Sequence, residues 1–469
     1  MDAKSKPLSD VVAAPVEKLS TKTMLLYGSG QTGAQLFRDA PAVLLPLFMT
    51  TMLGVTPWLA GVVVLVPKLW VIACDPIIGA LSDHYKPRFG RRPFLAWGAL
   101  FTALTFMGLF SFAVFPSPGI AALTVGALFF LFSTAFSAFS VPYLAVASEL
   151  SHDPHERTKV LAFRMIFSIV GVIMGVGLAQ PLVFSLGGDA AAWRSMAIIF
   201  GSICLLAMLA TTYGVPRDFG PAKVAAPNMG LRRFTALLEN KPFVILNLTM
   251  LVQTIAQGSS FAVVGFIFIY AVGDIGMLLP FVLSMALGAM ASQPFWVKFS
   301  GRVGKEHAFL VACIGWMLIT ITWIWVGPAD DVLVTLPLWG ELPTQHFLVL
   351  LRGVIIGVTN SGFSVLTFSL FTDTIGYQRE HHGDVDEGVF SGVFSATEKL
   401  AVALGPLLAG VVLSIYGFKS STGGPVAQDE TAIWGMILCY SIIPAVILGL
   451  SLLVFSRYGK AARLSPVVQ

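Results

Sequence analysis

Long apolar runs recur along the whole chain and alternate with shorter polar segments. An apolar run of about 18 residues or more is long enough to cross a bilayer as a helix. The pattern predicts twelve such spans, at residues 23–53, 57–81, 93–115, 119–146, 159–184, 193–214, 243–270, 275–298, 306–327, 344–372, 388–416 and 432–456. The expected fold class is therefore an all-α polytopic membrane protein.

Lysine and arginine residues gather in every second connection between these spans. Basic connections follow spans 2, 4, 6 and 8, whereas those after spans 1, 3, 7 and 9 contain no Lys or Arg. Positively charged connections remain on the cytoplasmic side of a membrane. We therefore expect an integral inner (plasma) membrane protein with both termini in the cytoplasm.

The longest basic connection divides the spans into two sets of six. Each half repeats one pattern between its second and third spans, GALSDHYKPRFGRRPFLAWGAL and WVKFSGRVGKEHAFLVACIGWML, in which the chain turns through Gly and cations. Two related six-helix bundles around a cavity are typical of carriers, and the repeat favours a carrier over a channel. The expected parts are an N-terminal tail, a first bundle, a linker, a second bundle and a C-terminal tail, at residues 1–22, 23–214, 215–242, 243–456 and 457–469.

Composition supports the membrane assignment and argues against other classes. The 469 residues are 56% hydrophobic and 12% charged, whereas ordinary globular domains carry about 25% charged residues. All four cysteines lie in apolar runs, so neither a disulfide framework nor a metal site is indicated. No nucleophile–base pair, phosphate loop or metal motif stands out. We expect no enzyme activity, no cofactor and no nucleic-acid partner.

Several spans carry polar stripes on one helical face. Span 1 places Gln31, Gln35, Arg38 and Asp39 at helical spacing, and spans 7 and 11 repeat the pattern with Gln253, Gln257, Ser260, Ser391, Ser395, Glu398 and Lys399. Polar groups face lipid only at high cost, so these stripes are expected to converge on a central cavity. The alternative for the glutamines and serines is hydrogen bonding between helices.

Span 2 places Lys68 and Asp75 seven residues apart, so they share one helical face. A carboxylate in a span can bind a cation or carry a proton, because burial disfavours its charged form. The expected role of Asp75 is therefore cation coupling. Lys68 is a candidate gating residue that could compete with the bound cation, and the alternative is a static ion pair between the two.

The segment DPIIGALSDHYKPRFGRRPF resembles the glycoside–pentoside–hexuronide:cation symporters, relatives of melibiose permease within the major facilitator superfamily. Three other segments agree with this resemblance: YGSGQTGAQLF, VPYLAVASELSHDPHERTKVLAFR and DVDEGVFSGVFSATEKL. The resemblance implies the major facilitator fold, with twelve helices in two six-helix bundles. It also implies alternating-access symport of a sugar or a related solute.

The chain departs from that family at acidic positions, where Val71, Ser140 and Gln35 stand. Sodium prefers several hard oxygen ligands, so these departures favour a proton as the coupling ion, carried by Asp75, Asp39 or Glu398. Leu144 replaces a tryptophan that stacks on galactosides, which argues against a galactoside substrate. The resemblance assigns substrate contacts to Arg164 and Lys399.

Five cations lie inside spans, namely Arg38, Lys68, Arg164, Arg352 and Lys399. A cavity lined by most of them would favour an anionic solute such as a uronide. The alternative is that they pair with carboxylates or extend towards the membrane surface.

Aromatic side chains near these charges could stack on a sugar ring. Trp70, Phe37 and Tyr143 are the candidates, and Tyr143 in the VPY turn is the preferred one. The alternative for all three is packing between helices.

The basic loops supply candidate gating residues. Asp83 is expected to pair with Arg91 or to cap a neighbouring helix, with Arg92 beside it, and Glu149 and Arg157 form a matching pair after span 4. The alternative is a solvated surface pair. The run around His381 lacks metal-ligand spacing and is interpreted as a hinge.

The leading interpretation is a monomeric symporter that moves a sugar, glycoside or uronide-like solute with a proton rather than sodium. The alternatives are a carrier of an anionic amphiphile, such as a lysolipid or pigment, and a non-transporting membrane assembly protein. The candidate substrate-binding residues are Gln35, Arg38, Asp39, Tyr143, Arg164, Gln253, Gln257 and Lys399.

Overall fold

The computed structural model describes residues 19–150, 154–215, 237–328, 331–336, 340–382 and 387–463. The first half of the chain contains α1 (Thr21–Met52), α2 (Pro57–Phe89), α3 (Arg92–Leu109), α4 (Pro118–Glu149), α5 (Pro154–Val172), the π-helical segment η2 (Ile173–Leu178), α6 (Ala179–Ser185) and α7 (Ala190–Gly214). Each of the first six predicted spans coincides with one long helix or, for α5, η2 and α6, with one continuous helical stretch.

The second half begins with α9 (Lys241–Phe266), the π-helical η3 (Ile267–Ala271), the 3₁₀ turn η4 (Ile275–Met277), α10 (Leu278–Val303), α11 (Lys305–Ile321) and the 3₁₀ turn η5 (Thr322–Trp325). A two-stranded antiparallel hairpin follows, formed by β1 (Val332–Leu336) and β2 (Gly340–Pro343). The remaining helices are α12 (Thr344–His382), α13 (Glu387–Ile415), α14 (Glu430–Tyr440), α15 (Ile442–Phe455) and α16 (Tyr458–Arg463).

Helix lengths and composition confirm an all-α polytopic membrane protein. Within the described ranges, 11 helical stretches are long and apolar enough to cross a membrane. Helix α1 is not among them, although it has 32 residues. Its polar stripe, which includes Arg38 and Asp39, lowers the mean hydropathy of any stretch of α1 that is long enough to span a membrane. With α1, the long helices number twelve.

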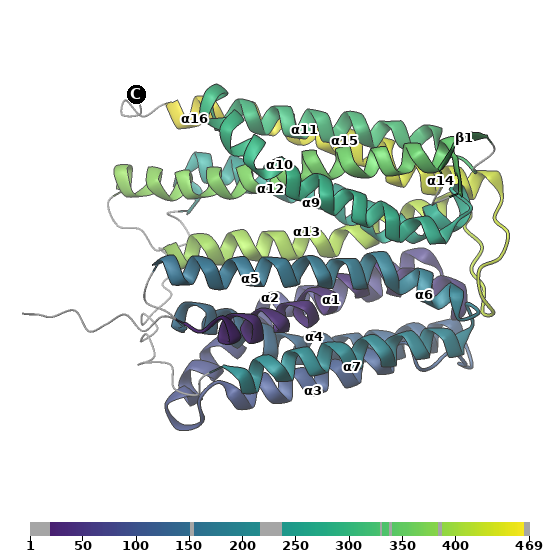
Figure 1. Cartoon of the computed structure of the whole chain (residues 1–469), viewed down its shortest axis with the longest axis horizontal. Coiled ribbons are helices and arrows are strands. Elements are labelled where there is room, and N and C mark those ends of the chain that lie inside the picture. Colours follow the sequence, from purple (N-terminus) through teal and green to yellow (C-terminus); the bar gives the residue numbers. More distant parts are fainter. Residues whose placement is uncertain are drawn as a thin grey trace, which may run out of the picture.

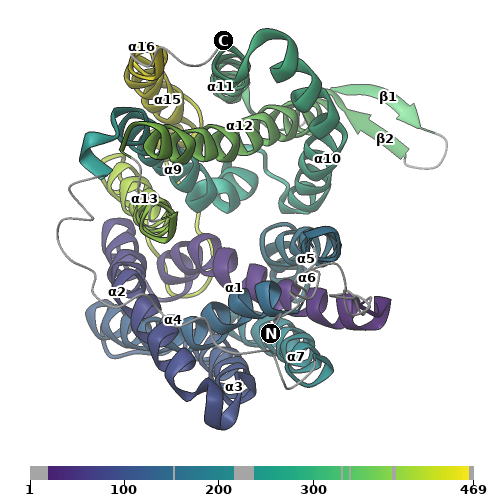
Figure 2. The same cartoon turned by 90° about the vertical axis from the view of Figure 1, so that its left-hand side faces the viewer.

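The helices form two groups. Helices α1 to α7 pack together, and α9 to α16 form a second group beside them (Figures 1 and 2). We call the side where α1 begins and α7 ends the terminal end. The opposite side, which holds residues 53–56 and 416–429, is the loop end (Figure 1).

The two groups are joined most closely at the loop end. The first half of α2 packs on the second half of α13, and the Trp58 N–H donates to Ser414 Oγ at 3.0 Å. Residues 416–429, which we call the loop strap, cross from the second group to the end of α1 (Figure 1). Backbone hydrogen bonds fix this crossing, from Gly54 N to Ser421 O and from Ser421 N to Thr50 O, each 2.8 Å.

The two predicted repeat loops have the same backbone geometry. Gly90 ends α2 with φ 69°, and Gly304 ends α10 with φ 85°. Left-handed backbone conformations of this kind favour glycine because it has no Cβ. Each glycine therefore allows an abrupt turn into the next helix, and the repeat is present in the structure as well as in the sequence.

Candidate functional site

The polar stripe of α1 forms a continuous hydrogen-bonded chain. Gln31 Nε2 donates to Gln35 Oε1 at 3.1 Å, and Gln35 Nε2 donates to Asp39 Oδ2 at 2.6 Å. Arg38 Nε donates to the other oxygen of Asp39 at 2.9 Å. Residues one turn apart on a helix are neighbours, which is why the i, i+4 spacing produces this ladder.

Helix α5 extends the ladder sideways. Arg164 Nε donates to Gln31 Oε1 at 2.8 Å, and Ser168 Oγ donates to Gln35 Oε1 at 2.8 Å. Helix α5 can approach α1 this closely because Gly171 leaves only its backbone against Thr32. Arg164 therefore points into the first group and not towards the membrane surface.

Asp75 forms an ion pair with Lys399 of α13, on the other side of the interface between the groups. The alternative of a static ion pair between Asp75 and Lys68 is therefore not what the structure shows. Lys68 Nζ instead donates to the backbone carbonyl of Arg38 at 3.2 Å, and it remains within electrostatic range of Asp39 and Asp75. One charged cluster thus connects α1, α2 and α13 across the interface.

The cluster and the adjoining hydrogen-bonded ladder together contain four of the five cations that lie inside spans. Glu398 joins it through its electrostatic interaction with Arg38. Arg352 lies elsewhere, because its guanidinium donates to Thr322 and stacks over the Trp323 ring at 5.4 Å. Arg38, Lys68, Arg164 and Lys399 are thus opposed by Asp39, Asp75 and Glu398. The near-balance of charge weakens the argument for an anionic solute.

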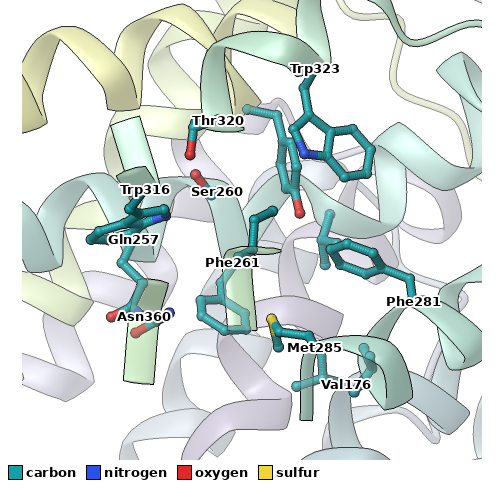
Figure 3. A pocket seen from close by; sticks show the side chains of 14 residues that line it. Val176, Gln257, Ser260, Phe261, Phe281, Met285, Trp316, Thr320, Trp323 and Asn360 are labelled. Atoms are coloured by element: carbon teal, nitrogen blue, oxygen red, sulfur yellow. The ribbon is translucent and has the colours of Figure 1, made fainter. Parts of the chain in front are cut away.

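A separate cavity of about 50 Å³ lies mostly within the second group. We call it the amide pocket, after Gln257 of α9 and Asn360 of α12, whose side-chain amides lie side by side (Figure 3). Its other polar or aromatic lining residues include Ser260, Trp316, Thr320, Trp323 and Tyr440. Val176 of η2 contributes a wall from the first group, so the pocket lies between the two groups.

Several predicted substrate contacts lie in packed regions. Gln253 is fully buried, and its amide donates to Cys313 Sγ at 3.4 Å. Tyr143 is also buried and stacks on Tyr27 with ring centroids 4.7 Å apart; each hydroxyl donates to the other residue's carbonyl. Hydrogen bonding between helices accounts for Gln253 and Tyr143 in this structure.

The other two aromatic candidates also pack against protein. Phe37 is fully buried against Phe106 and Phe132. Trp70 stacks on Phe130, and its indole N–H donates to Thr134 Oγ1 at 3.0 Å. Both side chains therefore match the packing alternative.

The loop between α2 and α3 contains the predicted pair. Arg91 Nη2 donates to Asp83 Oδ1 at 2.6 Å, and Arg91 Nη1 donates to Ser82 Oγ at 2.8 Å. Arg92 reaches the end of α7 and donates to the carbonyl of Val215 at 2.9 Å. The side chains of Glu149 and Arg157 lie outside the described residues, as do most residues of the run after His381.

Replacing Asp83 by Ala is expected to lower the free energy of unfolding by about 1.5–3 kcal/mol, because a nearly buried guanidinium loses a charged acceptor. The matched change in the second repeat is Lys305→Ala. It removes an ion pair with Asp373 that is exposed at both partners, and such pairs contribute about 0–1 kcal/mol. Thermal unfolding of both variants in detergent tests this difference. Equal losses of unfolding free energy for the two variants would contradict the larger contribution assigned to the Asp83–Arg91 pair.

Metal binding finds no support in the part of the chain that the structure describes. No group of three or more His, Cys, Asp or Glu side chains is arranged there to hold a metal ion. His381 Nδ1 instead lies 2.8 Å from the carbonyl of Tyr377, within its own helix. The charged cluster and the amide pocket are therefore the two candidate sites.

Two groups of long helices with ionic residues and a pocket between them define a polytopic membrane transporter. The family model described as MFS/sugar transport protein matches residues 26–459. The chain therefore belongs to the MFS/sugar transport protein family, and it is a transporter rather than an enzyme.

Curated relatives agree with this family. The isoprimeverose transporter of Lactiplantibacillus pentosus is 24% identical over 435 residues, which cover 90% of this chain and 85% of the relative. The inner membrane symporter YicJ of Escherichia coli (strain K12) is 23% identical over 464 residues, which cover 94% of this chain and 92% of the relative.

Solved structures share the fold. The nucleoside transporter NupG has a TM-score of 0.62 at 14% identity and covers 94% of this chain and 99% of its own. An inward-facing, unoccupied bacterial homologue of the human lysosomal transporter Spinster has a TM-score of 0.65 at 13% identity, covering 95% and 98%. At such low identities the likeness concerns the fold alone.

Proposed function

We propose that this chain is a secondary active symporter that moves a sugar or glycoside across the membrane together with a proton. The family and the symporter and sugar-transporter names among its relatives support sugar symport. The main support for ion coupling is the ion pair between Asp75 and Lys399, which joins the two helix groups. Protonation of Asp75 would remove its charge and release Lys399, so ion binding can control contact between the groups.

The surroundings of Asp75 favour a proton over sodium. Its second oxygen, Oδ1, is buried and has no hydrogen-bond partner among the described residues. Val71, one turn earlier on α2, offers no oxygen ligand. Sodium requires several hard oxygen ligands, whereas a proton needs only one carboxylate. Asp39 and Glu398 are further carboxylates that could relay the proton within the cluster.

The terminal end is assigned to the cytoplasm. The basic residues Lys86 and Arg88 end α2 there, and Arg302 and Lys305 flank the matching turn of the second group. The loop end, closed by the loop strap, then faces outward. We assign the structure to the state that is closed on the outer side. The two groups, at residues 23–214 and 243–456, are proposed to rock against each other within one monomer, joined by the cytoplasmic linker and flanked by cytoplasmic tails.

The second candidate, a carrier of an anionic amphiphile, is less well supported. A pocket for acyl chains or pigments should be lined almost entirely by apolar side chains. The amide pocket instead presents two amides and three hydroxyls beside its aromatic rings. A sugar uses these groups, whereas a hydrocarbon chain would leave them without partners.

The coupling ion is tested by uptake into proteoliposomes under imposed gradients. A panel of radiolabelled methyl glycosides and uronides is offered with either a pH gradient or a sodium gradient. We expect accumulation with the pH gradient and none with sodium alone. Accumulation driven by sodium at equal pH would overturn the proton assignment, and the absence of any sugar uptake would overturn the proposed function itself.

A further inference from the structure

Three polar side chains of the amide pocket have no hydrogen-bond partner among the described residues. Neither the Gln257 amide nor the Asn360 amide makes a hydrogen bond to another described residue, although both side chains are partly enclosed. The indole nitrogen of Trp323 is buried and likewise without a partner among the described residues. Buried polar groups are normally paired, so unpaired donors and acceptors around one cavity indicate a ligand.

The lining of the pocket is uncharged. None of the described residues that line it is acidic or basic. An isolated ionised group would be costly to place there, because desolvation would not be offset by an opposite charge. The ligand group that enters this pocket is therefore neutral. This separates the amide pocket chemically from the charged cluster on α1, α2 and α13.

The arrangement of amides and rings matches a sugar ring. Each side-chain amide offers two donors and one acceptor oxygen, which suits vicinal hydroxyls that both donate and accept. Figure 3 shows Trp316 above these two amides and Phe261 beside them. An aromatic face can pack against the C–H face of a pyranose, while the hydroxyls at the edge of the sugar ring bind the amides. Ser260 and Thr320 place two more hydroxyls on the same cavity wall.

The pocket is also in contact with both helix groups. The π-helical η2 of the first group supplies Val176, and its neighbour Gly177 packs against Val282 and Leu279 of the second group. The amides come from α9 and α12 of the second group. A ligand in this pocket therefore contacts both groups and can stabilise their closure around it.

We propose that the amide pocket binds an uncharged sugar ring of the transported solute, with Gln257 and Asn360 as its hydrogen-bonding residues and Trp316 as its stacking platform. This proposal rests on the proposed function and adds the position of the sugar and its lack of charge. The charged cluster then serves ion coupling, and a uronide carboxylate does not enter the amide pocket.

The first test measures exchange of radiolabelled methyl hexosides and pentosides in proteoliposomes without an ion gradient. Asn360→Ala and Gln257→Ala are each expected to raise the half-saturating concentration about tenfold, the upper range for a lost neutral hydrogen bond. The matched control is Asn247→Ala, which removes another α9 amide that binds Thr397 outside the pocket. Its half-saturating concentration is expected to stay within about twofold of wild type.

The second test uses cysteine protection and does not depend on the alanine variants folding. The four native cysteines are buried. Asn360→Cys is expected to react with N-ethylmaleimide, and a saturating methyl glycoside is expected to slow this at least fivefold. Thr372→Cys, at an exposed position of α12, should react equally with and without sugar. If Asn360→Cys does not fold, Gln257→Cys takes its place.

Two results would overturn the proposal while leaving symport intact. One is a cysteine at Asn360 or Gln257 that reacts equally with and without a transported sugar. The other is a wild-type protein that exchanges uronides but no neutral glycoside. Absence of all sugar exchange would instead contradict the proposed function.

Discussion

Replacing Asp75 by Asn is expected to abolish the accumulation of sugar driven by a pH gradient. Asparagine keeps the shape of the side chain but can neither carry a proton nor pair with Lys399 as an anion. A pH difference of two units can drive about hundredfold accumulation for one proton per sugar. The variant should instead equilibrate the sugar to a ratio near one. Accumulation is read from proteoliposomes loaded at the higher pH.

A control is needed because Asp75→Asn leaves the Lys399 ammonium without its carboxylate. Breaking a buried pair costs about 3–5 kcal/mol, and less here because Lys399 is 38% exposed and therefore screened by solvent. The double variant Asp75→Asn with Lys399→Gln removes both charges and should recover thermal stability. We expect it to exchange sugar yet still fail to accumulate it. Accumulation at the wild-type level in either variant would exclude Asp75 as the coupling residue.

Replacing Gly410 by Val is expected to hold the loop end open and to slow transport at least about fivefold. A Cβ at Gly410 would collide with the backbone of Pro57 and Trp58, so only glycine lets α13 lie this close to α2. Overpacking of this kind costs about 1–3 kcal/mol. That cost falls only on the closed state, so the equilibrium should shift about 5- to 150-fold towards opening.

Hydrogen exchange measures this shift directly. The amides of Gly54 and Ser421 donate across the interface in the closed state, so the peptides around them should lose protection in Gly410→Val. Gly126→Val is the matched control, because the nearest side-chain atoms there belong to Val63 at 3.8 Å, an ordinary contact. Unchanged protection in Gly410→Val would contradict the packing argument.

The sequence predicted the membrane helices well, because bilayer thickness imposes a length that hydropathy reveals. The predicted spans 57–81 and 193–214 fall within α2 and α7, and Gly90 and Gly304 of the two repeat loops both have positive φ angles. Local irregularities were missed. The π-helical segments η2 and η3, the hairpin β1–β2 and the break at Ser441 in the last span arise from packing that periodicity does not encode.

The candidate site was predicted in part. The i, i+4 spacing from Gln31 to Asp39 predicted a polar stripe on one face of α1, and in the structure these side chains are hydrogen-bonded to one another. The partner of Asp75 was not predicted, because Lys399 lies 324 positions away along the chain. Charge alone suggested Lys68, which shares the helix. The roles of all these residues in coupling and binding remain predictions.

The amide pocket shows a different limit of sequence analysis. Gln257 was expected to contact substrate because it belongs to a polar stripe. Asn360 and Trp316 come from helices with no comparable stripe, so no local signal marked them. Unpaired amides are recognisable only when three dimensions are known, because a partner can come from any helix.

The loop strap has a consequence for how fast the carrier can cycle. Its bonds to α1 run mainly between main-chain atoms, so they are present whatever the acidity and whichever side chains occupy the strap. Opening the loop end must break them together. The return of the empty carrier to a state open at the loop end should therefore have a high activation enthalpy, with turnover that rises steeply on warming.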